Sequence, residues 1–204
     1  MKDEKSLRFE CTRCGNCCTD KNTIVNLTYL DILRIKAGLK LDLNEILNIL
    51  GFYVFEKDLT SDDKKRMSIS PVITEKGLAF IGLLKSSIGN CFFYDSKNKK
   101  CRIYELRPLF CKTFPFSFKY NVENQTNKKI DIIYTEKGKE YCPGISNEAP
   151  LINYDEWIEL GKKILEDLEK NYILIKEWNK SVKNNKVSPK VKNFILNIFK
   201  LNKN

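Results

Sequence analysis

The sequence predicts an α+β fold: a small cysteine-rich metal-binding domain of short β-hairpins and helices, followed by a helical C-terminal extension. Eight cysteines occur among 204 residues, and four of them fall within eight consecutive positions. Short runs of β-branched and large apolar residues occupy the middle of the chain, whereas apolar residues at helical spacing dominate its last quarter. We therefore divide the chain into a cysteine-cluster domain at residues 1–150 and a basic helical extension at residues 151–204.

Two helices are expected after the first cysteines. The first is predicted over residues 28–38 and the second over residues 42–51, each ending at a glycine. Each begins with a side chain that can accept a hydrogen bond, and an acidic residue follows three positions later, Asp31 in one case and Glu45 in the other. This spacing is typical of a capping box.

The middle of the chain predicts two β-hairpins. The first pairs residues 67–74 with 78–84 and follows a charged stretch that we interpret as a solvated loop over 56–66. The second pairs residues 91–94 with 101–104, so that one cysteine opens each strand.

Prolines and glycines mark the region that follows. Pro108 and Pro115 exclude a long regular helix, which leaves one helical turn at residues 109–113. A strand is expected over 130–135, and a turn at 142–144 closes the cysteine-bearing part of the chain.

Two helices are predicted in the extension. The first runs over residues 154–179 with Asp155 as its cap, and the second begins at Ser188 with Pro189 in its first turn. The apolar residues of the first helix recur in steps of three and four: Trp157, Leu160, Ile164, Leu168, Tyr172, Ile175 and Trp178.

The basic charge of the chain is concentrated in this extension. The formal net charge is +10, and the residues from Lys176 onward carry eight lysines against one glutamate. Lys190, Lys192, Lys200 and Lys203 surround the apolar stripe of the last helix. Three roles fit this helix: packing on the core, weak contact with nucleic acid or an anionic surface, or binding a partner helix.

Several function classes are excluded by what the sequence lacks. There is no histidine, which removes Ser-His and Cys-His nucleophiles and histidine-ligated metal sites. No glycine-rich phosphate loop occurs. The charged N-terminus carries no apolar export signal, and no run of about 18 apolar residues predicts a transmembrane segment, so we expect a cytoplasmic location.

The cysteines are the candidate metal ligands. They are Cys11, Cys14, Cys17, Cys18, Cys91, Cys101, Cys111 and Cys142. Disulfides are disfavoured in a reducing cytosol, and scattered core cysteines would rarely cluster as the first four do. The clustering therefore predicts metal binding through thiolates.

The spacing of the first cluster leaves the number of sites open. Cys11, Cys14 and Cys17 match the first three ligands of the bacterial ferredoxin pattern, but Lys21 stands where that pattern requires a cysteine, and the Cys-Pro pair at residue 142 is distant in sequence. If the backbone is extended, Cys17 and Cys18 point apart, so that one completes a first site while the other faces a second or is an inert neighbour. The eight thiols thus make two four-thiolate sites, or one site with spare thiols.

Three motifs resemble a known family. They are Phe9-x-Cys11-x2-Cys14-Gly15-x-Cys17-Cys18, Gly89-x-Cys91-x-Phe93 and Cys101-x-Ile103-Tyr104-x2-Arg107-Pro108-x2-Cys111-x2-Phe114-Pro115-Phe116. This arrangement is similar to the YkgJ-type cysteine-cluster family, the zinc- or iron-chelating CxxCxxCC domain, over residues 9–145. The resemblance implies binding of zinc or an iron–sulfur cluster without an assigned reaction. A more distant relative in motif is flagellin lysine N-methylase.

We favour an iron–sulfur cluster, with [4Fe–4S] as its form, over zinc. Structural zinc usually binds two paired knuckles, whereas this chain has one dense knuckle and four single cysteines. Aromatic residues beside Cys91 and Cys111 would limit solvent at a cluster. Arg107 is expected at the site, whereas Arg102 is expected on the surface.

The function hypothesis that follows is a metal-binding protein with a redox role and a partner protein that the sequence does not identify. Two alternatives stay open. In one, zinc holds the fold and a surface binds protein or nucleic acid. In the other, the chain is a protein-modifying enzyme resembling the methylase, although no cofactor site for such a reaction is visible in the sequence.

Overall fold

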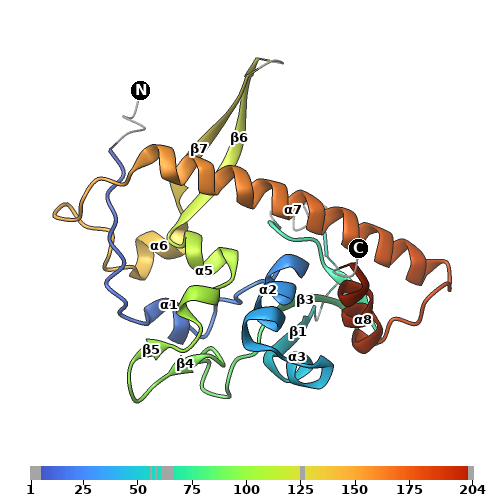
Figure 1. The fold of residues 1–204 in the computed structure, drawn as a ribbon. Coiled ribbons are helices and arrows are strands. Elements are labelled where there is room, and N and C mark those ends of the chain that lie inside the picture. The colour runs from blue at the N-terminus through green and yellow to red at the C-terminus, as the bar shows by residue number, and fades with distance from the viewer. Residues whose placement is uncertain (1–5, 56, 58, 61–66, 125–126, 202–204) are drawn as a thin grey trace.

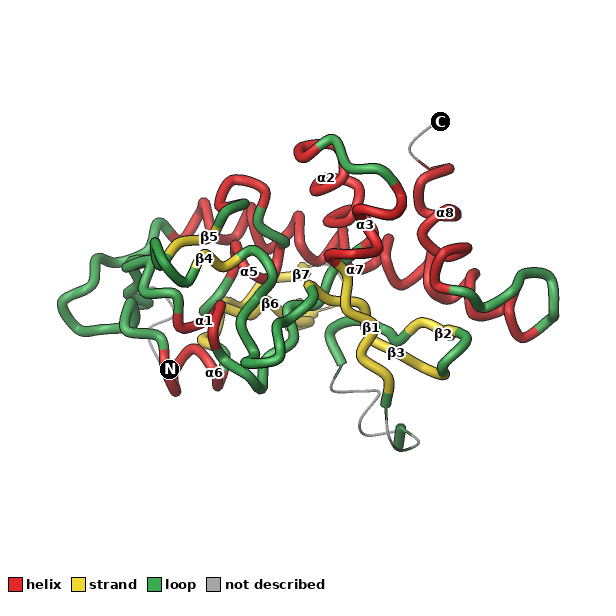
Figure 2. The backbone as a smooth tube through the Cα atoms, turned by 90° about the horizontal axis from the view of Figure 1, so that it is seen from below, coloured by secondary structure: helices red, strands yellow, loops and turns green. Residues whose placement is uncertain are grey.

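The computed structural model describes residues 6–55, 57, 59–60, 67–124 and 127–201. Helices and small antiparallel sheets are mixed along the chain, which confirms the α+β class and the helical C-terminal region. The long helix α7 (Tyr154–Lys183) runs along one side of the molecule for most of its length (Figure 1). The cysteine-bearing loops lie toward one end of it, and a three-stranded sheet with three helices lies toward the other (Figures 1 and 2).

Both predicted capping boxes are present. In helix α2 (Tyr29–Leu39) the Thr28 hydroxyl accepts from the Asp31 amide at 3.1 Å, and the Asp31 carboxylate accepts from the Thr28 amide at 3.0 Å. Helix α3 (Leu43–Ile49) repeats the arrangement with Asp42 and Glu45. The predicted ends were wrong by one or two residues, because α2 continues to Leu39 and α3 gives way to a strand at residue 50.

A three-stranded antiparallel sheet holds the first predicted hairpin. Strand β2 (Val72–Thr74) pairs with β3 (Gly77–Leu83), which confirms the hairpin with a shorter first strand. Strand β1 (Leu50–Val54) pairs with the other edge of β3, and the sequence did not predict it. Strand β3 lies about thirty residues further along the chain, so no local turn indicates that the two strands pair. Most of the predicted loop at 56–66 lies outside the described residues.

The second hairpin exists but is shorter and shifted. Strands β4 (Tyr94–Asp95) and β5 (Lys100–Cys101) pair so that Tyr94 faces Cys101. The prediction that a cysteine opens each strand was therefore wrong: Cys91 precedes β4 in a bridge to Lys85, and Cys101 ends β5. A 3-10 turn, η1 (Tyr104–Leu106), and the predicted single helical turn, α5 (Leu109–Thr113), follow.

A two-stranded ribbon rises beside α7 (Figure 1). It joins β6 (Phe116–Asn124) to β7 (Asn127–Tyr134), so the strand predicted at 130–135 exists as the second half of a longer one. Strand β6 and the short helix α6 (Glu136–Tyr141) were not predicted. The turn at 142–144 is present, with the Ile145 amide donating to the Cys142 carbonyl at 3.2 Å.

The two C-terminal helices are present with different caps. Asn153, not Asp155, caps α7 by accepting from the Glu156 amide, and α7 continues to Lys183. Helix α8 (Val191–Leu201) begins after the predicted cap at Ser188, and its first amide donates to the Glu75 carboxylate at 2.8 Å. A carboxylate from the β2–β3 turn thus takes the place of a local cap.

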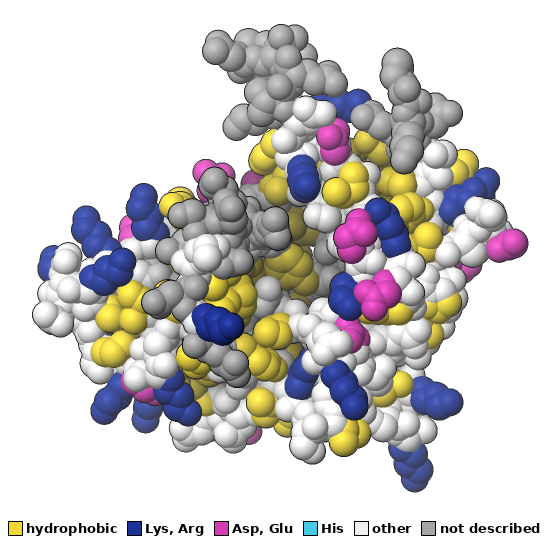
Figure 3. All heavy atoms as spheres, turned by 180° about the vertical axis from the view of Figure 1, so that it is seen from behind, with side chains coloured by type: hydrophobic (Ala, Val, Ile, Leu, Met, Phe, Trp, Pro, Cys, Tyr) yellow, Lys and Arg dark blue, Asp and Glu magenta, His cyan; other side chains and the backbone are white. Residues whose placement is uncertain are grey.

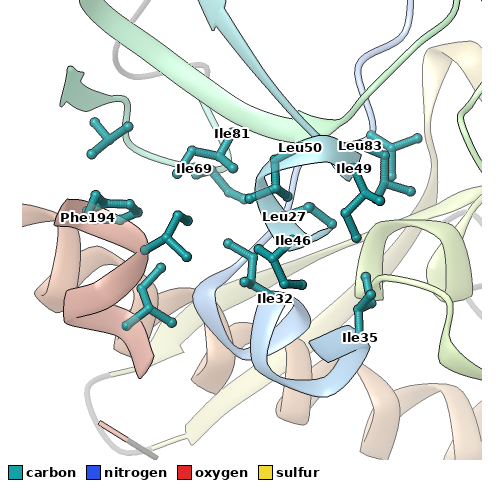
Figure 4. Packing of buried hydrophobic residues seen from close by; sticks show 14 of the residues in the cluster. Leu27, Ile32, Ile35, Ile46, Ile49, Leu50, Ile69, Ile81, Leu83 and Phe194 are labelled. Atoms are coloured by element: carbon teal, nitrogen blue, oxygen red, sulfur yellow. The ribbon is translucent and has the colours of Figure 1, made fainter. Parts of the chain in front are cut away.

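The main core includes both C-terminal helices. Ile32, Ile46, Ile81 and Phe194 lie in one buried cluster, together with Ile195 and Ile198 of α8 (Figure 4). This confirms the first of the three roles predicted for the last helix, packing on the core. A second cluster joins β6 and β7 to α7 around Phe116, Ile132 and Ile164.

On the face drawn in Figure 3, the Lys and Arg side chains of the described residues are spread among apolar and uncharged ones rather than gathered in one patch. Lys190, Lys192 and Lys200 are exposed, and Lys203 lies outside the described residues. Within the described part of the chain, no helix combines the length and the apolar character needed to cross a membrane.

Candidate metal centre

The first cysteine cluster lies on a tight bend that enters a single helical turn. Helix α1 (Asn16–Thr19) carries Cys17 and Cys18. Gly15 precedes it with a φ of 83°, a left-handed conformation that glycine adopts without steric cost. A Cβ at Gly15 would lie 2.5 Å from the Tyr94 hydroxyl, so the glycine also admits the β4 tyrosine against the bend.

The helical turn changes the expected relation between Cys17 and Cys18. Adjacent residues on a helix are about 100° apart rather than on opposite faces. Their sulfurs interact: the Cys18 thiol donates a hydrogen bond to Cys17. That bond, opposed by burial, lowers the pKa of Cys17 to about 7 and raises the pKa of Cys18. The prediction of diverging side chains, which assumed an extended backbone, was wrong.

Six of the eight predicted cysteines line one cavity of about 290 Å³. They are Cys11, Cys17, Cys18, Cys91, Cys101 and Cys111. A single water molecule needs about 10–15 Å³ of such space, so the cavity has room for a group of many atoms. Apolar side chains such as Val25, Leu83 and Phe93 complete the wall.

A second cavity of about 230 Å³ accounts for the remaining two cysteines. Cys14 and Cys142 line it together with Cys11, Cys17 and Cys111, which also face the first cavity. All eight predicted ligands therefore surround two adjoining cavities. Among the described residues, no three cysteine, aspartate or glutamate side chains converge on a point as the ligands of one bound ion do.

Burial disfavours the charged form of several thiols at the two cavities. Burial raises the pKa of Cys91, Cys101 and Cys111, and the charge of Cys17 adds to the rise at all three. Burial also raises the pKa of Cys142, but the thiolates that contribute there are those of Cys14, Cys17 and Cys11. A bound metal would offset this cost, since it binds thiolates and releases their protons.

A cationic edge borders both cavities. The Arg107 guanidinium stacks 3.6 Å from the centre of the Tyr104 ring, and its Nε donates to the Tyr104 carbonyl at 2.9 Å. Arg13 lies 4.6 Å from the same ring. The Arg107 charge opposes the rise in pKa at Cys101 and Cys111 and adds a smaller contribution to the lowered pKa of Cys17, so it favours their thiolate forms. Arg102 instead packs on Phe92 at an exposed position, as expected.

A buried carboxylate positions the segment that carries Arg107 and Cys111. Asp31 is fully buried and accepts from the Leu109 amide at 3.0 Å, the first residue of α5. Arg34 bridges the same carboxylate to the Arg107 carbonyl, at 3.0 Å from that carbonyl. The sequence indicated Asp31 only as part of a capping box, because its second partner lies 78 residues away.

The potential ligands that line the cavities suit a thiophilic metal. Apart from Glu105 at the first cavity, the acidic or thiol side chains on both walls are cysteines. Thiolates select zinc, copper(I) or iron–sulfur clusters over hard cations such as Mg²⁺ and Ca²⁺. The residues present therefore fit either a zinc site or an iron–sulfur cluster in the type of donor atom.

Comparison with known proteins agrees with this chemistry. Residues 10–143 match the CxxCxxCC family, whose description reads "Putative zinc- or iron-chelating domain". The chain is 29% identical over 140 residues to a Methanocaldococcus jannaschii protein named "Uncharacterized protein MJ0661". That alignment covers 68% of this chain and 59% of the relative's length. No solved structure matches the chain.

Proposed function

The chain belongs to the CxxCxxCC family of zinc- or iron-chelating domains, and from this premise we propose that it is an iron–sulfur protein with a redox role. The observation that supports the proposal most is the gathering of six thiols around one cavity of about 290 Å³. The thiols come from the N-terminal knuckle (residues 11–18), the loop before β4, strand β5 and helix α5, so segments that are distant in the sequence meet at this cavity.

The size of the cavity favours a cluster over a single zinc ion. A Zn–S bond is about 2.3 Å, so four thiolates on one zinc lie only about 3.8 Å apart. In a [4Fe–4S] cluster each of the four thiolates binds a different iron atom, and the ligands surround a larger volume. The distribution of six thiols around a cavity of this size therefore supports a cluster over a single zinc ion.

The surroundings of the cavity support a redox role. When bound, an iron–sulfur cluster supplies one-electron chemistry whose potential depends on net charge, solvent exposure and hydrogen bonds to sulfur. Here Phe93 and Leu83 exclude water on one side, and Arg107 offsets negative charge. Cys11 and Cys14 are exposed, so one edge of the site is open to a partner protein that exchanges electrons.

Anaerobic purification of the full chain, followed by iron, zinc and acid-labile sulfide analysis, tests the proposal. We expect a brown protein that contains iron and sulfide in equal amounts and is bleached by dithionite. A colourless protein with stoichiometric zinc and no sulfide would instead support the alternative in which zinc holds the fold. In that case the redox role would be abandoned.

A further inference from the structure

The first set of cysteines is joined by contacts between the knuckle, the hairpin and α5. The Cys91 amide donates to the Cys18 carbonyl at 2.8 Å, which holds these two residues side by side. Pairing of Tyr94 with Cys101 in the β4–β5 hairpin brings Cys101 to the cavity that Cys18 and Cys91 line. Cys111 faces the same cavity from α5.

The second set is joined by contacts between the knuckle and the turn after α6. The Glu10 amide donates to the Gly144 carbonyl at 3.1 Å, one residue before Cys11 and two residues after Cys142. A Cβ on Gly144 would lie 2.2 Å from the Glu10 carbonyl oxygen, so this approach requires glycine.

A further contact ties the middle of the knuckle to the same turn. Asn16, which lies between Cys14 and Cys17, donates from its side-chain amide to the Tyr141 carbonyl at 3.1 Å. Tyr141 directly precedes Cys142. Hydrogen bonds on both sides of Cys14 thus join the knuckle to the residues that flank Cys142.

We propose that the chain builds two adjacent iron–sulfur centres, one bound by Cys18, Cys91, Cys101 and Cys111 and the other by Cys11, Cys14, Cys17 and Cys142. The proposal rests on the proposed function and adds to it the number of centres and the ligands of each. Two cavities of about 290 and 230 Å³ with a common wall provide the space.

The second ligand set has a recognisable chemical pattern. Three cysteines at two-residue spacing bind three corners of a four-iron cluster, and a remote cysteine followed by proline provides the fourth ligand in two-cluster ferredoxins. Cys142 is followed by Pro143, and the fold brings this pair to Cys11 and Cys14. The Cys-Pro pair is distant from the first cysteines in sequence, but in the tertiary structure Cys142 lines the same cavity as they do.

The boundary between the centres falls between two adjacent residues. Cys17 faces both cavities and continues the two-residue spacing of Cys11 and Cys14, which assigns it to the second centre. Cys18 faces only the larger of the two cavities and is bonded through its carbonyl to Cys91, which assigns it to the first. Neighbouring positions on α1 therefore serve different centres.

Anaerobic reconstitution of the full chain with ferric iron, dithiothreitol as the reductant, and sulfide tests the number of centres. Two [4Fe–4S] clusters require about eight iron and eight sulfide per chain. After reduction with dithionite we expect an electron paramagnetic resonance signal broadened by two interacting clusters. About four iron and four sulfide with an unbroadened signal would overturn the inference and leave the proposed function intact. Zinc without sulfide in the anaerobically purified chain, before any reconstitution, would overturn both.

Matched double variants test the ligand sets. Cys14→Ala with Cys142→Ala removes two ligands from one centre, and we expect about half of the iron to remain with a narrow signal. Cys101→Ala with Cys142→Ala removes one ligand from each centre and should lose more iron than the first pair. Equal iron loss in the two pairs would contradict the assignment. Circular dichroism identifies a variant that has not folded, and the wild-type iron count tests the number of centres without any variant.

Discussion

Replacing Asp31 with alanine tests whether this buried carboxylate holds the site together. Its side chain is fully buried and accepts from the Thr28 amide and the Leu109 amide, each at 3.0 Å, and it is paired with Arg34. Asp31→Ala would leave both amides without an acceptor and Arg34 without its carboxylate. Each buried donor left without a partner costs about 1–3 kcal/mol. The Arg34 side chain is 29% exposed, so water can hydrate it and the lost ion pair adds less.

From the two unsatisfied amides we expect Asp31→Ala to lower the free energy of unfolding by about 2–5 kcal/mol, a large fraction of a typical total of about 5–15 kcal/mol. Urea unfolding of the reduced, metal-free protein measures this loss. Glu45→Ala is the matched control, because Glu45 occupies the same capping-box position in α3 but is exposed. It should lose only about 0.5–1 kcal/mol, the net value of one hydrogen bond.

Two results would refute this reasoning. If Asp31→Ala and Glu45→Ala lose equal stability, the tertiary bond from Leu109 to Asp31 contributes nothing measurable. If Asp31→Ala is destabilised as expected but retains full iron and sulfide, the carboxylate stabilises the fold without positioning Cys111. Far-ultraviolet circular dichroism at low urea distinguishes local loosening of α5 from global unfolding.

Three further outcomes are expected from urea unfolding. Gly144→Ala should lower the free energy of unfolding by about 1–3 kcal/mol, because the new Cβ would lie 2.2 Å from the Glu10 carbonyl oxygen. An unchanged urea midpoint would contradict this close approach. Phe194→Ala should lower the free energy of unfolding by about 3–5 kcal/mol, since the ring is 2% exposed. A loss below about 1 kcal/mol would show that α8 contributes little to the core. Asp167→Asn should stabilise the protein at pH 7, because burial raises the pKa of Asp167 above its unfolded value and its ionised form is costly. That gain should disappear as the pH falls below both pKa values, and a gain independent of pH would refute this explanation.

Local features of the fold were predictable because their causes are local. The capping boxes at Thr28 and Asp42 depend on residues three positions apart, so the sequence alone indicates them. The β2–β3 hairpin and the single turn of α5 depend on short apolar runs and on Pro108. The chemical identity of the ligands was predictable for a similar reason, since cysteine clustering is visible without a fold.

Elements whose partners are distant were missed. Strand β1 exists through pairing with β3, about thirty residues further along, and β6 exists through β7 and α7. On α7 the predicted apolar stripe included Tyr172, which is 51% exposed, whereas Asn171 is buried and accepts from the Tyr29 amide at 2.9 Å. Helical spacing does not reveal that a polar residue faces the core until its partner is known.

The sequence by itself determined that this chain presents eight thiols, no imidazole and a capped α+β framework, because composition and short-range spacing decide donor chemistry and helix starts. Only the tertiary structure decided which thiols are neighbours. Cys142 lies beside Cys11 because Gly144 contacts the backbone of Glu10, and Cys91 lies beside Cys18 through one backbone hydrogen bond. These cysteines become neighbours when distant segments bury apolar surface together and form backbone hydrogen bonds. The spacing of residues along the chain does not predict which segments will do so.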